Sequence, residues 1–265
     1  MSRPVTIITG ASSGIGAATA RRLAQEGMCL TLAARRESRL RNLAEEVKRL
    51  GGEALVVPTD VTQRADIHRM VQDTLDRWGR VDVLLNDAGV SYDGAFVDFE
   101  SDRLRAEMHV NLVGVIECTQ AVLPVMLRQN SGHVINVASI EGLIATPGSS
   151  VYCATKFGVV GFSDALRREL HGTGVHISAF CPGYTPSELT PRLKAHVDGR
   201  PDAPYHPGMM PVGYVADQIA RLIRHPRRLV VIPRSRNILV LVAFLFPGIA
   251  DALVARFKAK RTASI

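Results

Sequence analysis

The chain has 265 residues, 46% hydrophobic and 22% charged, and its 32 Lys and Arg against 25 Asp and Glu give a formal net charge of +7. This globular composition excludes a disordered chain or a coiled coil, and the length suits one α/β domain. Four cysteines without a CxxC pair indicate neither a disulfide framework nor a metal site, so we expect no metal and a reducing, cytoplasmic location. The longest apolar run, nine residues at 238–246, is short for a membrane-spanning helix.

Short β-branched runs alternate with stretches of helical periodicity along most of the chain. Strands are predicted at Val5–Thr9, Cys29–Ala33, Ala54–Pro58, Val81–Asn86, His133–Ala138, His176–Phe180 and Leu229–Ile232. Helices are predicted at Gly14–Glu26, Glu37–Leu50, Gln63–Trp78, Glu100–Leu127, Val151–His171 and Gly213–Arg224. This order predicts an α/β fold, a doubly wound parallel sheet with helices on both faces, in a single domain over 1–233. Within it, the proline-rich stretch 184–211 is expected to be a binding loop.

A glycine-rich turn, Thr9-Gly10-Ala11-Ser12-Ser13-Gly14-Ile15-Gly16, joins the first strand to the first helix. Glycine at 10 permits a sharp turn, Gly14 lets the backbone approach a pyrophosphate, and Gly16 permits close packing of helix and strand. The N-terminus of the helix offers N–H groups and partial positive charge to phosphates. The pattern predicts a dinucleotide site, although an ordinary glycine-rich βα turn is the alternative.

The second strand ends with Ala33-Ala34-Arg35-Arg36, 19 residues after Gly16. A site for NAD(H) usually has an acid near this point, which binds the ribose hydroxyls. Here Arg35 offers a planar set of donors to a 2′-phosphate, and Arg36 adds charge or stacks on the adenine. We therefore expect NADP(H) rather than NAD(H). The alternative is that both arginines begin a solvated helix face.

Tyr152 and Lys156 are spaced i, i+4 at the start of a predicted helix, which places the phenol and the ammonium on one face. A cation beside a phenol lowers its pKa and favours acid–base catalysis. Ser139, 13 residues before Tyr152, ends a strand and is in reach of the same substrate oxygen.

These features together resemble the short-chain dehydrogenase/reductase family, in its single-domain branch with a Rossmann fold, over residues 4 to 233. The matching segments are TGASSGIG at 9–16, Asp60-Val61, Asn86-Asp87-Ala88-Gly89, Asn111, Ser139, Tyr152, Lys156 and Pro182-Gly183. The resemblance implies an oxidoreductase that interconverts a carbonyl and an alcohol with NADP(H), and a homodimer or homotetramer.

The resemblance also implies roles for single residues. Tyr152 is the general acid or base, Ser139 holds the substrate oxygen, Lys156 binds the nicotinamide ribose and lowers the pKa of Tyr152, and Asn111 anchors a water. The cofactor is contacted by Gly10, Ser12, Ser13, Gly14, Ile15, Gly16, Arg35, Arg36, Asp60, Val61, Asn86, Ala88, Gly89, Tyr152, Lys156, Pro182, Gly183 and Ser187. Asp87 replaces the family's usual second Asn; because a carboxylate cannot donate, we expect an altered hydrogen-bond network with intact chemistry.

The substrate side is predicted to be apolar, which favours a hydrophobic ketone, aldehyde or alcohol such as a lipid, steroid or retinoid. The residues that indicate this are Ile140, Leu143, Ile144, Tyr184, Leu189, Leu193, Tyr205, Met209 and Met210.

The charge is concentrated in the C-terminal part of the chain. Residues 221–265 hold ten Lys and Arg and one acid, Asp251. Because these bases flank an apolar segment and form no nucleic-acid motif, nucleic acid is not expected as a partner. The extension 234–265 is interpreted either as a membrane-surface element or as a segment that covers the pocket or a subunit interface.

Two further functions are considered. A non-catalytic NADP(H)-binding sensor or scaffold is disfavoured by the presence of both Ser139 and Tyr152. A sugar-nucleotide epimerase is disfavoured because the chain has no room for a larger substrate domain.

Overall fold

The computed structural model describes residues 3–186, 188–189, 209–233, 235–248 and 251–252. Its centre is a seven-stranded parallel sheet in the order β3-β2-β1-β4-β5-β6-β7. The strands are β1 Val5–Thr9, β2 Cys29–Ala34, β3 Glu53–Pro58, β4 Val83–Asn86, β5 Gly132–Val137, β6 Val175–Pro182 and β7 Leu229–Ile232. All seven predicted strands are present, with ends that differ by at most two residues.

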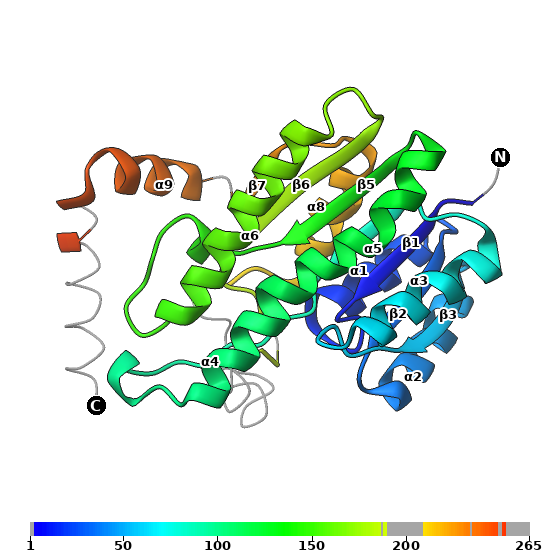
Figure 1. Cartoon of the computed structure of the whole chain (residues 1–265), viewed down its shortest axis with the longest axis horizontal. Helices are drawn as coiled ribbons and strands as arrows, with labels where there is room; N and C mark the ends of the chain where they lie inside the picture. Colours follow the sequence, from blue (N-terminus) through cyan, green and yellow to red (C-terminus); the bar gives the residue numbers. More distant parts are fainter. Residues whose placement is uncertain (1–2, 187, 190–208, 234, 249–250, 253–265) are drawn as a thin grey trace.

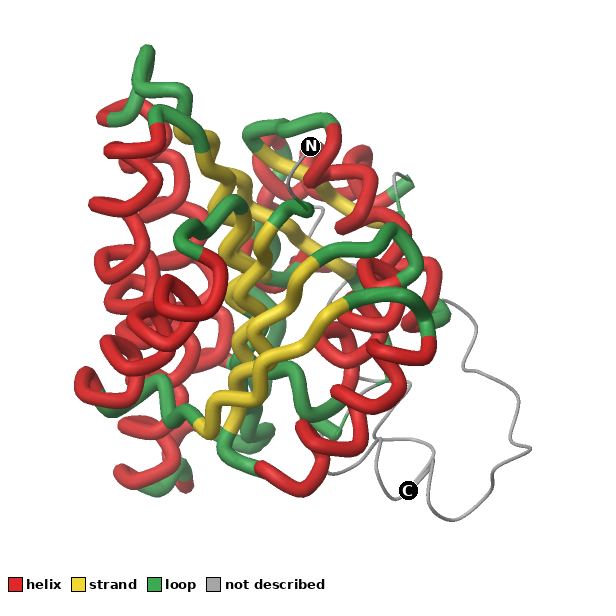
Figure 2. The backbone as a smooth tube through the Cα atoms, turned by 90° about the vertical axis from the view of Figure 1, so that its right-hand side faces the viewer, coloured by secondary structure: helices red, strands yellow, loops and turns green. Residues whose placement is uncertain are grey.

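Helices cover both faces of this sheet (Figure 2). The main ones are α1 Gly14–Ala24, α2 Glu37–Arg49, α3 Arg64–Trp78, α4 Ser101–Met108, α5 Gly114–Gln129, α6 Ser150–Glu169, α8 Val212–Arg224 and α9 Arg236–Leu245. Apolar side chains of α1, α2 and α8 form one hydrophobic cluster with the sheet, and those of α3, α5 and α6 form another. The expected doubly wound α/β fold, with helices on both faces of the sheet, is confirmed.

The strands are apolar without alternation because both of their faces are covered. Every residue of β1 and of β5 is buried. Ile7 and Ile8 point to opposite clusters and are both fully buried. Burial of one such side chain contributes about 1.5–3 kcal/mol to folding.

The chain leaves β1 on one side toward β2 and returns to the other side of β1 at β4. Loops after these two strands therefore separate at the carboxyl edge of the sheet. In open α/β sheets, this reversal of strand order creates a crevice that accepts a ligand. The fold thus places the glycine-rich turn after β1 and the Asn86–Gly89 segment after β4 on the same crevice.

The predicted helix Glu100–Leu127 differs from the structure in one respect. The helical run Ser101–Gln129 contains a π turn at His109–Val113 between α4 and α5. Asn111 in this turn is fully buried, and its side chain bonds both the N–H and the carbonyl of Val90 at 2.8 Å. Such π turns are frequent at functional sites. By length and composition the run is apolar enough to cross a membrane, but its buried residues Cys118, Val122 and Met126 pack in the core against the sheet.

The C-terminal helix α9 extends away from the layered body (Figure 1). Val240 packs against the cluster that holds Val231 of β7, but α9 has no fully buried residue. The side chains of Ile238 and Phe244 are 70% and 83% exposed. An apolar helix with this exposure presents a surface suited to an apolar contact.

Candidate active site

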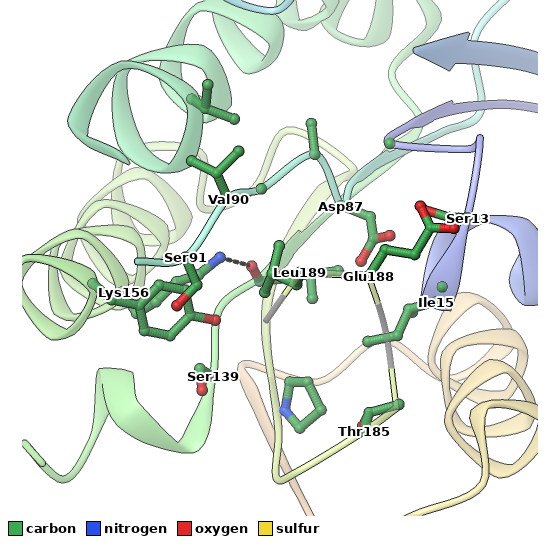
Figure 3. Close-up of a pocket in the computed structure, with 18 of the residues that line it drawn as sticks. Ser13, Ile15, Asp87, Val90, Ser91, Ser139, Lys156, Thr185, Glu188 and Leu189 are labelled. Carbon is green, nitrogen blue, oxygen red and sulfur yellow. Dashed lines mark hydrogen bonds between the residues drawn. The ribbon is translucent and has the colours of Figure 1, made fainter. Parts of the chain in front are cut away.

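A cavity of about 500 Å³ opens at the carboxyl edge of the sheet, at the reversal of strand order. Figure 3 shows Ser139 and Lys156 at one end of it, Ser13 and Ile15 at the other, and Asp87 between them. Ser139 follows β5 and Lys156 lies on α6, while Ser13 and Ile15 lie where the turn after β1 enters α1. The cavity therefore joins two groups of residues that the sequence singled out separately.

The glycine-rich turn forms one wall of the cavity through Gly10, Ser12, Ser13, Gly14 and Ile15. Gly10 has a φ of +73°, and a Cβ there would lie 2.8 Å from the Ala88 backbone nitrogen. Gly14 has a φ of +56° and begins α1, whose first turn contains no acid. This helix N-terminus, with glycine at positions 10 and 14, fits the pyrophosphate of a dinucleotide.

Gly16 does not line the cavity but packs beneath the turn. A Cβ on Gly16 would lie 2.8 Å from the Gly10 carbonyl oxygen and 2.9 Å from Oδ2 of Asp87. The predicted role of Gly16 in close packing agrees with this geometry.

Arginines gather where β2 ends. Arg35 and Arg36 both line the cavity. Arg36 donates to the hydroxyls of Ser12 and Ser13 at 2.8 Å, and its Nη1 lies 2.5 Å from Glu188. Arg39 of α2 also pairs with Glu188, and the hydrogen bonds from Arg39 and Arg36 lower the pKa of Glu188 to about 2. Arg35 and Arg36 are also exposed directly before α2, as the alternative of a solvated helix face requires, and Arg41 pairs with Glu37 farther along that helix.

The hydrogen bonding of Asp87 is altered, as the presence of Asp where the family usually has Asn predicts. The Gly16 N–H donates to its carboxyl group, so the acid serves as the acceptor. Burial raises the pKa of Asp87 to about 7, while Lys156 and the Gly16 N–H partly offset this. The chain thus carries, in the cavity wall, a carboxyl group that changes charge near neutral pH.

We expect the affinity for NADP⁺ to fall about two- to fourfold from pH 6 to pH 7.5, because the newly ionised Asp87 repels the cofactor phosphates. A pKa of about 7 leaves Asp87 mostly neutral below this range and mostly charged above it. Asp87→Asn keeps an acceptor for the Gly16 N–H and should remove this pH dependence. Titration of NADP⁺ by calorimetry measures the effect, with Asp76→Asn on the exposed side of α3 as the control. The same pH dependence in Asp87→Asn would refute it.

Ser139, Tyr152 and Lys156 meet at the other end of the cavity. The Ser139 hydroxyl accepts the N–H of Glu141 at 3.1 Å and hydrogen-bonds the phenol of Tyr152. Lys156 Nζ lies 5.5 Å from the centroid of the Tyr152 ring and donates to the Val137 carbonyl at 2.9 Å. All three side chains are buried yet line the cavity.

The expected lowering of the pKa of Tyr152 by Lys156 is not found in the protein alone. Burial, and secondarily Glu141, raise the pKa of Tyr152 above its ordinary value, although the Ser139 hydrogen bond acts in the opposite direction. Burial also lowers the pKa of Lys156 to about 8. The reason for the difference is that desolvation of the phenol exceeds the influence of an ammonium directed at a backbone carbonyl. Tyr152 is consequently a neutral phenol that can donate a proton.

Besides Gly16, two more predicted site residues lie outside the cavity wall. Asn86 is buried and donates to Asn136 at 2.9 Å and to Thr119 at 3.1 Å. It joins β4 to β5 and to α5, as its predicted role in the sheet requires, and its side chain does not line the cavity. Asn111 is equally buried and holds Val90, whose neighbours Gly89 and Ser91 line the cavity.

The other predicted cofactor residues line the cavity, and Ser187 lies outside the described residues. Those in the wall are Asp60, Val61, Ala88, Gly89, Pro182 and Gly183. Asp60 accepts the N–H and the hydroxyl of Thr62 at 2.9 and 2.8 Å, which fixes the turn after β3.

The substrate side is less apolar than predicted. Ile140, Tyr184 and Leu189 line the cavity, but Met210 packs in the core, and Leu143 packs against the core cluster behind the wall. Ile144 and Met209 are not in the wall either, while Leu193 and Tyr205 lie outside the described residues. The wall also contains Thr185 and Glu188 of the predicted binding loop, and residues that the sequence did not indicate, among them Val90, Ser91, Tyr92, Asp93 and Ser149. Proximity in sequence to Gly89 was the available signal for residues 90–93.

The fold and the cavity define a dinucleotide-dependent oxidoreductase with a serine–tyrosine–lysine centre. The profile of the short chain dehydrogenase family matches residues 4–198. The chain belongs to this family, and it is an oxidoreductase that acts on C=O and CH–OH groups.

Similar proteins and solved structures agree with this family assignment. Ketoacyl reductase HetN of Nostoc is 34% identical over 86% of this chain and 78% of its own length. A 3-oxoacyl-[acyl-carrier-protein] reductase of Synechocystis is 37% identical over 72% of this chain and 78% of its own. A Burkholderia phymatum short-chain dehydrogenase/reductase in complex with NAD superposes with a TM-score of 0.84 at 27% identity, covering 93% of this chain and 95% of its own. Actinorhodin polyketide ketoreductase with NADPH gives 0.77 at 29% identity, covering 87% of this chain and 95% of its own.

Proposed function

We propose that this enzyme uses NADP(H) to interconvert a hydrophobic ketone or aldehyde and its alcohol. The observation that carries the proposal is the single cavity wall that holds Arg35 and Arg36 at one end and Ser139, Tyr152 and Lys156 at the other. A dinucleotide spanning this wall brings its nicotinamide to the phenol and its adenosine ribose to the arginines.

The preference for NADP(H) rests on charge at the end of β2. Arg35 is exposed, lines the cavity and makes no ion pair with any residue that the structure describes. Its guanidinium matches the planar, two-pronged geometry of phosphate recognition. An acid that would bind ribose hydroxyls is missing from residues 33–36.

The catalytic step follows from the protonation states of the side chains. When bound, the reduced cofactor supplies a hydride to the substrate carbonyl carbon. Ser139 holds the carbonyl oxygen, and the neutral phenol of Tyr152 donates its proton to the negative charge that develops there. Lys156, an ammonium below its pKa of about 8, stabilises the resulting phenolate. In the alcohol-oxidising direction the same groups act in reverse.

The hydrophobic substrate class is supported by Ile140, Tyr184 and Leu189 in the wall. The acids Glu141 and Asp93 line the same region and disfavour an anionic substrate such as a phosphorylated metabolite. Among hydrophobic ketones, 3-oxoacyl chains are supported by the names of the ketoacyl reductase relatives.

A substrate panel tests the proposal. Short and long 3-oxoacyl thioesters, steroid ketones, retinal and aromatic ketones are each incubated with NADPH and with NADH, and cofactor oxidation is followed at saturating cofactor. We expect turnover with NADPH on apolar carbonyls, and kcat/KM to rise with chain length. Turnover confined to sugars or phosphorylated compounds would refute the substrate class, and a consistent advantage of NADH would refute the cofactor preference.

We also propose that the chain works in the cytoplasm as a homodimer or homotetramer, with the exposed face of α9 as a subunit contact. The side chains of Leu241 and Phe244 are 58% and 83% exposed, which suits burial against a second copy. Light scattering of the full chain and of a chain without residues 234–265 measures the assembly. Pelleting of both chains with lipid vesicles measures membrane binding. Loss of assembly on truncation supports the subunit contact. Unchanged assembly together with loss of vesicle binding supports the membrane-surface alternative.

A further inference from the structure

Glu188 connects the segment after β6 to the arginines at the end of β2. Its two carboxylate oxygens each lie 2.5 Å from an arginine, one from Nη1 of Arg36 and the other from Nη1 of Arg39. Arg36 in turn donates to the hydroxyls of Ser12 and Ser13 in the glycine-rich turn. Glu188 itself lines the cavity, in the region of Ser13 and Ile15 in Figure 3.

The carboxylate therefore occupies donors that a phosphate would need. Carboxylates and phosphates bind guanidinium groups with the same geometry, through pairs of N–H donors. A carboxylate of charge −1 also cancels part of the positive charge of Arg35, Arg36 and Arg39. A 2′-phosphate at this end of the cavity must replace Glu188 on the arginines or share them with it, at the cost of repulsion between two anions.

A cofactor without the 2′-phosphate lacks the group that competes for these arginines. Its ribose hydroxyls are neutral, so the adenosine end of this cofactor does not need to replace Glu188 on Arg36 and Arg39. Glu188 should therefore lower the affinity for the cofactor that has the 2′-phosphate and leave the affinity for the other cofactor unchanged.

We propose that Glu188 is a specificity-determining residue, whose carboxylate competes with the 2′-phosphate of NADP(H) for Arg36 and Arg39 and so sets the ratio of affinities for NADP(H) and NAD(H). The proposal rests on the proposed function, since it assigns these arginines to the 2′-phosphate.

The size of the effect follows from exposure. The side chains of Glu188, Arg36 and Arg39 are 37%, 43% and 46% exposed, so water screens the pairs. Exposed ion pairs of this kind contribute little each, and we expect removal of both to change affinity by about three- to tenfold. The effect should shrink in 0.5 M salt, which screens exposed charges over about 4–5 Å.

The test compares Glu188→Gln with the unchanged chain. Glutamine keeps the size of the side chain and one oxygen acceptor but removes the charge. Calorimetric titrations with NADP⁺ and NAD⁺ measure dissociation constants without turnover. Titrations with adenosine 2′,5′-bisphosphate and with 5′-AMP isolate the 2′-phosphate from the nicotinamide end.

The matched control is Glu45→Gln, which removes the same charge from α2. Glu45 pairs with Lys48 on the exposed side of the helix and does not line the cavity. We expect Glu188→Gln to raise the affinity for NADP⁺ and for the bisphosphate about three- to tenfold, and to leave the affinity for NAD⁺ and for 5′-AMP within twofold. Glu45→Gln should change none of these affinities.

The outcomes separate this inference from the proposed function. Equal changes for both cofactors, or weaker NADP⁺ binding in Glu188→Gln, would overturn the role of Glu188 while leaving the preference for NADP(H) intact. If the unchanged chain prefers NAD⁺ and Glu188→Gln still tightens only NADP⁺, the preference fails and the role of Glu188 stands.

Discussion

Replacement of Tyr152 by Phe is expected to reduce turnover about 10³-fold or more, while the affinity for NADPH stays within threefold. The change removes a single oxygen and leaves the ring, which is 8% exposed and packs in the wall. The variant removes the hydroxyl that hydrogen-bonds Ser139 and that would give its proton to the carbonyl oxygen held there. Because the ring has no hydroxyl to be ionised, raising or lowering the pH should not restore activity.

The measurement is steady-state NADPH oxidation with the best substrate of the panel, paired with a fluorescence titration of NADPH. Tyr214→Phe on the exposed side of α8 is the control, since Tyr214 does not line the cavity. Unchanged kcat in Tyr152→Phe would show that another group supplies the proton. Loss of NADPH binding together with turnover would instead assign Tyr152 to the cofactor site.

Replacement of Arg35 by Asp is expected to lower the affinity for NADPH about 100-fold and to leave the affinity for NADH unchanged or higher. The variant removes a guanidinium from the cavity wall and introduces the type of side chain that binds ribose hydroxyls. Electrostatic repulsion between Asp and a 2′-phosphate adds to the loss of the favourable contact.

Arg41→Asp is the control, because this variant changes the charge of α2 by the same amount, and Arg41 pairs with Glu37 outside the cavity. Dissociation constants for NADPH and NADH are measured for all three chains at one ionic strength. Similar ratios of the two affinities in the unchanged chain and in Arg35→Asp would contradict the assignment of Arg35.

The cavity shows why some of the site could be predicted and the rest could not. Tyr152 and Lys156 share a helical turn, and Gly10, Gly14 and Gly16 share one βα turn, so local spacing already fixes their relative positions. Glu188 is 152 residues from Arg36, and no periodicity relates the two. The apolar character of Met210 predicted a pocket residue, but the same character suits the hydrophobic core, where Met210 is buried.

The pKa values of the site residues also depend on the tertiary structure. The spacing of Tyr152 and Lys156 predicts attraction between a cation and a phenolate, and it contains no information on desolvation. Burial raises the pKa of Tyr152 and lowers that of Lys156, and these shifts come from the elements that enclose both side chains. Asp87 titrates near neutral pH for the same reason.

Patterns along the chain were enough to predict the order of strands and helices, the glycine-rich turn, the Ser139–Tyr152–Lys156 set and the arginines after β2, because each is contained in a short stretch of sequence. That these groups meet in one cavity, that Asn86 and Asn111 support its wall from behind, and that Glu188 reaches Arg36 and Arg39 is visible only in the folded chain. Burial and charge pairing arise between distant segments, and their strength depends on distances that local patterns do not contain.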